Sequence, residues 1–201
     1  MVIVIDPQIA GISGDMLLSS LVNLGADKNK IIEGIIKSQK FLPGSTIKKM
    51  DFQKIQKRGI ESTELILEID EDISARKGIE IKKAILDSVN ELSLPIKAKT
   101  FAESCINTLI SSESKIHGIS EDTVHFHEAS SIDTLVDIVG ITIALDNLKF
   151  FEEKIVCLPI SVGGGTVSFS HGTMSNPASA VLQIFKNSNL NIQGNNSKEE
   201  L

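Results

Sequence analysis

The chain has 201 residues, enough to bury a sizeable core, and its 41% hydrophobic and 23% charged residues are ordinary for a globular protein. A formal net charge of −6 argues against binding to duplex nucleic acid, which requires a basic surface. No apolar run is long enough to span a bilayer, and the N-terminal MVIVIDP lacks the basic start and cleavage site of a signal peptide. We therefore expect a cytoplasmic protein with neither a membrane nor a nucleic-acid partner.

The N-terminal part of the chain combines a strand, two helices and a hairpin. Val2–Ile5 is a short continuous apolar run, which predicts a strand covered on both faces. After a glycine-rich turn, a helical pattern over residues 15–24 ends before a glycine, and Asp27 can cap a second helix over residues 28–37. Residues 46–70 alternate weakly around an Arg-Gly pair, which predicts a β-hairpin.

Helical patterns dominate the rest of the chain. They cover residues 79–92, 96–115, 131–148 and 177–186, with Pro95 between the first two and Pro177 at the start of the last. Residues 154–162 have a strand pattern, and residues 188–201 form a polar tail. We therefore expect an α/β fold, a mixed sheet with flanking helices, in a single domain spanning residues 1–201. The hairpin and the middle helices could form a small inserted lobe of that domain.

The segment His125-Phe-His-Glu128 is the strongest local signal for a metal site. In an extended chain, residues two apart point the same way, so His125 and His127 can meet one metal ion while Phe126 faces the core. Glu128 and Asp133 can supply oxygen ligands or orient an imidazole. Imidazole combined with carboxylate suits nickel, zinc, iron or manganese.

Two further carboxylates and a third histidine lie near this segment. Asp133 and Asp137 are four residues apart, so they share one face of the predicted helix, and Gly140 and Ala144 continue that face with small residues. His117 lies a few residues upstream. The alternative interpretation is a set of hydrogen-bonded structural histidines beside a solvated acidic helix face.

A glycine loop connects the first strand to the first helix. Gly11, Ser13 and Gly14 at a helix N-terminus offer backbone N–H groups to an anion, although neither a Walker loop nor a dinucleotide motif is present. Asp6 and Asp15 could instead hold Mg²⁺. The alternative is a tight turn in which Asp15 complements the helix dipole.

A second glycine run, Gly163-Gly164-Gly165, follows the later strand pattern. Consecutive glycines cost folding entropy, and a close approach of the backbone to a phosphate would explain them. A bulged hairpin turn is the other explanation. His171, in the glycine-flanked turn that follows, is a fourth candidate functional histidine.

Three stretches, DPQIAGISGDM, VHFHEASSIDTLVDIVG and LPISVGGGTVSFSHGTMSNPA, resemble in order and spacing the motifs of the LarC family of nickel insertion proteins. The chain has Ala129-Ser130-Ser131 where family members more usually have Val-Gly-Ala. The resemblance implies insertion of Ni(II) into pyridinium-3,5-bisthiocarboxylic acid mononucleotide, with a nickel–carbon bond formed and CTP hydrolysed. The product is the nickel-pincer cofactor of lactate racemase and related enzymes. This would be a lyase-class nickel insertion enzyme.

The resemblance covers only the N-terminal portion of the family architecture, so we expect this chain to be insufficient alone and CTP to bind a C-terminal domain. Further expected partners are an apo-lactate-racemase-type acceptor and other copies of the chain, with Mg or Mn as additional ions. The expected metal ligands are His117, His125, His127, Asp137 and His171; the catalytic residues are Asp15, Glu128 and Asp133; and the nucleotide-binding residues are Gly11, Ser13, Gly14, Gly163, Gly164 and Gly165. The alternatives are a non-catalytic metal-binding or oligomerisation scaffold and a Mg-dependent phosphohydrolase.

Overall fold

The helix α5, Ile132–Asn147, lies at the centre of the molecule in the computed structural model, which describes residues 1–57, 59–169 and 172–195. Its side chains Ile132, Leu135, Val136 and Val139 are fully buried because neighbouring helices pack around it. These helices are α1 (Gly14–Asn23), α2 (Lys28–Ser38), α3 (Gly78–Glu91) and α4 (Ile96–His117), and α6 (Ser179–Lys186) packs on α4. Short 3₁₀ turns are η1 (Gln39–Phe41), η2 (Glu128–Ser130) and η3 (Phe150–Glu152).

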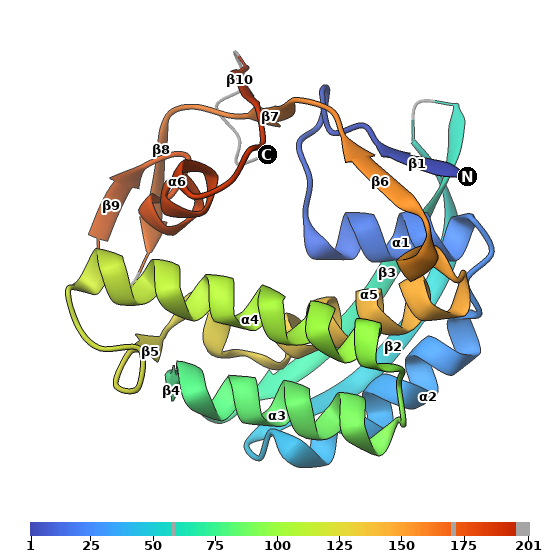
Figure 1. Cartoon of the computed structure of the whole chain (residues 1–201), viewed down its shortest axis with the longest axis horizontal. Coiled ribbons are helices and arrows are strands. Elements are labelled where there is room, and N and C mark those ends of the chain that lie inside the picture. The colour runs from blue at the N-terminus through green and yellow to red at the C-terminus, as the bar shows by residue number, and fades with distance from the viewer. Residues whose placement is uncertain (58, 170–171, 196–201) are drawn as a thin grey trace.

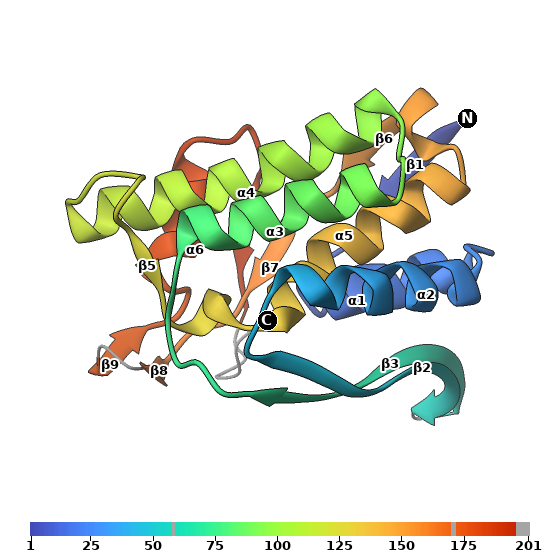
Figure 2. The same cartoon turned by 90° about the horizontal axis from the view of Figure 1, so that it is seen from below.

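A long hairpin covers one face of the helices. It pairs β2 (Ser45–Lys57) with β3 (Ile60–Glu71) in antiparallel register, as the alternating pattern predicts. α1 and α2 lie between this hairpin and the α3–α4 pair (Figure 2). Ile47 and Phe52 join the central core, whereas the outer face carries cross-strand ion pairs such as Lys48–Asp70. The hairpin is thus a layer of the same fold.

Parallel strands run along another side of the helices (Figure 1). β1 (Val2–Ile5) pairs with β6 (Lys154–Cys157), and β7 (Ile160–Val162) pairs with β10 (Ile192–Gly194). Three antiparallel pairs complete the strands: the hairpin, β4 (Arg76–Lys77) with β5 (His125–Phe126), and β8 (Thr166–Phe169) with β9 (Gly172–Ser175). Parallel and antiparallel strands with flanking helices confirm the expected α/β class.

Several local expectations differ from the structure. The strand predicted over residues 154–162 is split into β6 and β7 around Pro159, which has no N–H for a strand ladder. α6 begins at Ser179, not at Pro177, and β10 lies within the stretch expected to be a polar tail. Val2 and Val4 are 58% and 57% exposed, so β1 is not covered on both faces. No helix in the described ranges is long and apolar enough to cross a membrane.

Candidate functional site at the junction of two helices

Three carboxylates gather where α1 and α5 begin. Each helix has a serine N-cap followed two residues later by an aspartate: the Ser13 hydroxyl donates to Asp15, and the Ser131 hydroxyl donates to Asp133. Asp137 follows one turn further along α5. Because a helix N-terminus carries a partial positive charge, both ends favour the carboxylates there.

Gly14 lets the two helices approach closely at this point. A Cβ atom built on Gly14 would lie 2.1 Å from both Cγ and Oδ2 of Asp137, far inside van der Waals contact. Only glycine therefore fits beside the Asp137 carboxyl group. The sequence analysis assigned Gly14 to a phosphate loop, whereas the structure gives it a packing reason. Gly140 of α5 also allows close packing, because a Cβ atom built on it would lie only 2.8 Å from Cδ2 of Leu18 in α1.

The environment of Asp137 changes its acidity. Burial first, and then the negative charges of Asp133 and Asp15, raise the pKa of Asp137 to about 7. A carboxyl group with a pKa near neutrality can both accept and release a proton at physiological pH. Asp15 and Asp133 thus both act on the acidity of Asp137. The sequence predicted that Asp133 and Asp137 share a helix face but not the approach of Asp15.

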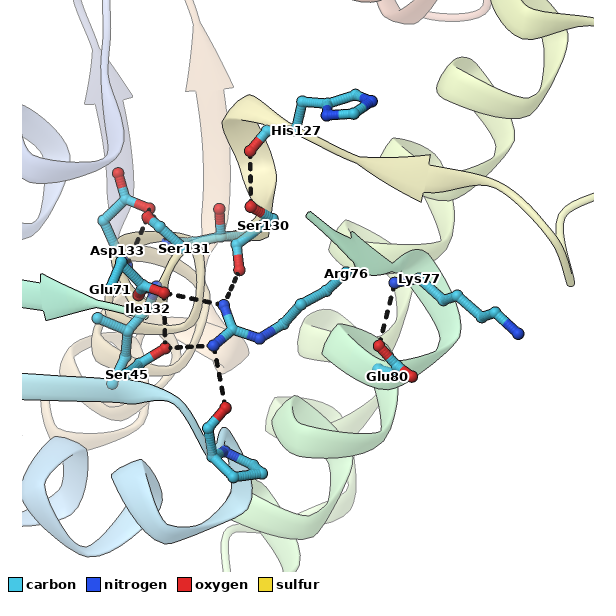
Figure 3. Close-up of polar contacts among 12 residues, drawn as sticks. Ser45, Glu71, Arg76, Lys77, Glu80, His127, Ser130, Ser131, Ile132 and Asp133 are labelled. Carbon is cyan, nitrogen blue, oxygen red and sulfur yellow. Dashed lines mark hydrogen bonds and ion pairs between the residues drawn. The ribbon is translucent and has the colours of Figure 1, made fainter. Parts of the chain in front are cut away.

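The histidine segment has the predicted alternation. Val124 and Phe126 are 0% and 2% exposed, whereas His125 and His127 are exposed, so the two imidazoles lie on the solvent side of the chain. The ring of His127 points away from Asp133 (Figure 3). His117 lies at the end of α4, where its Nε2 is 3.4 Å from an oxygen of Glu113.

The metal-ligand assignments stay a prediction. Among residues 1–57, 59–169 and 172–195, no group of three or more histidine, cysteine or acidic side chains is arranged to hold a metal ion. The side chain of Glu128 and the whole of His171 lie outside what the structure describes. Asp6, the other candidate for a cation, accepts hydrogen bonds from the backbone and side chain of Gln8.

A buried ion pair fastens the histidine segment to α5 (Figure 3). Arg76 is 4% exposed and its guanidinium lies 3.0 Å from Glu71. Glu71 also accepts a hydrogen bond from the backbone N–H of Ile132, at 2.8 Å. The sequence analysis assigned no role to either Glu71 or Arg76. One signal was available: only two of the twenty basic residues are arginines, and arginine is preferred where a buried fork of donors is needed.

The two glycine loops start close to each other, although β1 and β7 belong to different sheets. The carbonyl of Pro7 accepts hydrogen bonds from the N–H groups of Gly11 and Ser161, at 3.2 and 3.1 Å, so the loop after β1 lies beside β7. The run Gly163–Gly165 leaves directly from the end of β7. Loops that leave the ends of strands are common ligand-binding positions in α/β folds. A mostly apolar cavity of about 340 Å³ next to α1 is lined by Gly11 and Asp6 but by none of the three consecutive glycines. Binding of a nucleotide at both loops stays a prediction.

The fold and this site define an α/β protein with an acidic helix junction beside exposed histidines. The chain belongs to the nickel insertion protein family, whose model matches residues 3–201, which confirms the resemblance seen in the three motifs. A putative nickel insertion protein of Methanococcoides burtonii is 32% identical over 192 residues. Pyridinium-3,5-bisthiocarboxylic acid mononucleotide nickel insertion proteins of Staphylococcus saprophyticus and Staphylococcus epidermidis are 35% and 38% identical over 177 residues.

These matches cover 96%, 88% and 88% of the chain, respectively, but only 45%, 42% and 42% of the relatives. The chain therefore spans less than half the length of the curated relatives that it matches. No solved structure was found to match it.

Proposed function

We propose that this chain forms the nickel-handling N-terminal part of an enzyme that inserts nickel into pyridinium-3,5-bisthiocarboxylic acid mononucleotide. The names of the two staphylococcal relatives support the substrate. The observation that carries the proposal is the carboxyl group of Asp137, which is packed against Gly14 and has a pKa raised to about 7. Inserting a metal into a carbon–hydrogen bond requires such a group to take up the proton.

Nickel is a substrate of this reaction, and the exposed histidines are suited to deliver it. His125 and His127 lie on one side of an extended segment and can bind a divalent ion as neutral imidazoles. We assign Glu128 beside them as a further ligand or catalytic carboxylate from the sequence. His117 and His171 are secondary candidates for holding the ion, whereas Asp137, the other metal ligand expected from the sequence, is assigned to the proton instead.

The aspartates take up the proton that the reaction releases. When nickel replaces hydrogen on the pyridinium ring, one nickel–carbon bond forms, one carbon–hydrogen bond breaks, and a proton leaves with no change in electron count. Asp137 accepts this proton, and Asp15 and Asp133 favour its protonated form through their negative charges. The loops at Gly11–Ser13 and Gly163–Gly165 hold the phosphate of the mononucleotide through backbone N–H groups.

CTP and its Mg or Mn ion belong, in this proposal, to the part of the longer relatives that this chain does not match. No lysine- or arginine-bearing loop suited to a triphosphate is present in the sequence. The chain alone should therefore bind nickel or the mononucleotide weakly without completing insertion.

The test is to incubate the chain with Ni²⁺, CTP and the mononucleotide, with and without the C-terminal part of a staphylococcal relative, and to assay activation of an apo-lactate racemase. We expect activation only when the C-terminal part is added. Full activation by the 201-residue chain alone would refute the division of labour. No activation under either condition, with nickel binding intact, would favour a metal-binding scaffold.

A further inference from the structure

The backbone that joins the two exposed histidines to α5 is held by Arg76 from two directions. The backbone of Arg76 belongs to β4 and pairs with Phe126 of β5, between the histidines. Its guanidinium reaches past that strand and donates to the carbonyl of Ser130, at 2.5 Å. Ser130 in turn donates through its hydroxyl to the carbonyl of His127, at 2.6 Å. One residue therefore ties both ends of the histidine segment.

Glu71 completes the attachment on the helix side. Its Oε1 accepts from the N–H of Ile132, the first residue of α5, while its Oε2 lies 3.0 Å from Arg76 Nη1 and accepts from the hydroxyl of Ser45 at 2.9 Å. The pair thus holds the chain immediately before and immediately after Ser131, the N-cap of α5 (Figure 3). Two contacts that bracket one residue fix the direction in which the helix starts.

Both terminal nitrogens of the Arg76 guanidinium and both oxygens of Glu71 have defined partners. Arg76 Nη2 donates to the carbonyl of Pro43 at 3.0 Å and to the hydroxyl of Ser45 at 2.7 Å, in addition to the contacts of Nη1. A lysine, with one ammonium group, cannot reproduce this fork. Apolar residues of similar size often stabilise a protein core as well as a buried ion pair does. A contribution to stability is therefore not enough to explain why this ion pair is present.

We propose that Arg76 and Glu71 are positioning residues of the nickel-handling site: they hold the segment from His127 to Ile132 against the hairpin ends, where Ser45 and Glu71 lie. The identity of the metal in this inference rests on the proposed function, whereas the positioning role rests on the contacts alone. Through α5 the pair sets where Asp133 and Asp137 stand relative to Gly14. The hydrogen bonds of both side chains go to protein groups, so the pair acts through the residues that it holds.

The experiment uses the 201-residue chain, with Ni²⁺ alone as the probe. The variants are Arg76→Lys, Glu71→Gln and the milder Ser45→Ala, which removes one shared hydroxyl and preserves the ion pair. The control is Glu91→Gln, which breaks an exposed ion pair with Lys40 (2.7 Å) and removes no contact of Arg76 or Glu71. Two quantities are measured well below each melting temperature: the backbone amide NMR signals of Gly14 and Asp133, and the Ni²⁺ dissociation constant by calorimetry.

We expect Arg76→Lys and Glu71→Gln to move the amide signals of Gly14 and Asp133 and to raise the Ni²⁺ dissociation constant about tenfold, as loss of outer partners of metal ligands does. Ser45→Ala should shift the same signals by less, and Glu91→Gln should leave them unchanged. Unmoved Gly14 and Asp133 signals with only a lowered melting temperature would overturn the inference. If the unmodified chain binds no Ni²⁺, the proposed function fails, while the Gly14 and Asp133 signals still decide whether the pair positions the site.

Discussion

Asp137 makes the folding stability of this protein depend on pH. Its pKa rises from 3.8 to about 7 on folding, so between these values the folded chain binds more protons than the unfolded chain. The free energy of unfolding should therefore fall as the pH rises from about 4 to about 7. Burial is the first cause of this shift, which the sequence could not show, because a carboxyl group on a helix face is usually solvated.

Replacing Asp137 by asparagine removes this pH dependence. Asp137→Asn should be about 1–3 kcal/mol more stable than the parent chain at pH 8, and the difference should shrink toward zero near pH 4. Urea unfolding at pH 4, 6 and 8 measures it, with the exposed Asp122→Asn as the matched control. A stability gain of equal size at pH 4 and pH 8 would exclude the ionisation of Asp137 as its source.

The exposed histidines can be tested separately from the carboxylates. His125→Ala and His127→Ala should each weaken Ni²⁺ binding about tenfold or more, and binding to the parent chain should fall below about pH 6, where imidazoles protonate. Calorimetric titration measures both effects. His117→Ala, on the end of α4, provides the comparison. Equal heats for the parent chain and all three variants would show that these imidazoles are not nickel ligands.

At the scale of helices and strands, the sequence predicts an element correctly where that element has a local pattern, such as an N-cap or an alternation of apolar residues. Asp27 accepts from the N–H groups of Asn29 and Lys30, as an N-cap should, and the hairpin begins and ends within one residue of the predicted range. β10 was missed because three exposed residues in a polar stretch carry no strand period, and only pairing with β7 makes them a strand.

The approach of α1 to α5 yields a prediction at this scale. Gly14→Ala should cost about 1–3 kcal/mol of stability, because the new methyl group must displace the Asp137 carboxyl or separate the helices. Thermal unfolding measures the loss. Gly194→Ala is the control, since a Cβ atom there meets nothing within 4 Å and the backbone is unstrained. Equal melting temperatures for the two variants would show that α1 and α5 do not pack as described.

At the scale of the whole molecule, the candidate site joins segments from distant parts of the chain. The motifs around Asp15, His125 and Gly163 were each found from the sequence, but their spatial relation depends on how α1 packs on α5 and how β7 runs beside the loop after β1. The Glu71–Arg76 pair was missed for the same reason. Its partners lie at Pro43, Ser45, Ser130 and Ile132, and no spacing rule connects them.

The parallel strand layer should contribute less to stability than the helical core. Val4 in β1 is 57% exposed, whereas Leu18 in α1 is fully buried. Val4→Ser should therefore change the free energy of unfolding by less than about 1 kcal/mol, and Leu18→Ala should cost about 2–5 kcal/mol. Denaturant unfolding of the 201-residue chain compares them. A large loss from Val4→Ser would mean that this strand is covered in solution.

The contact between Gly14 and Asp137 also restricts how family sequences can vary. With no space for a Cβ atom at position 14 while an aspartate occupies position 137, the two positions should change together: a larger residue at 14 is tolerated only with glycine or alanine at 137. Gly14→Ala should accordingly be rescued in stability by Asp137→Ala, and the double variant should lose the carboxyl group that we propose as the proton acceptor. A family member with a larger residue at position 14 can therefore keep this packing only by losing the carboxyl group at position 137. Sequences that retain Asp137 should retain Gly14.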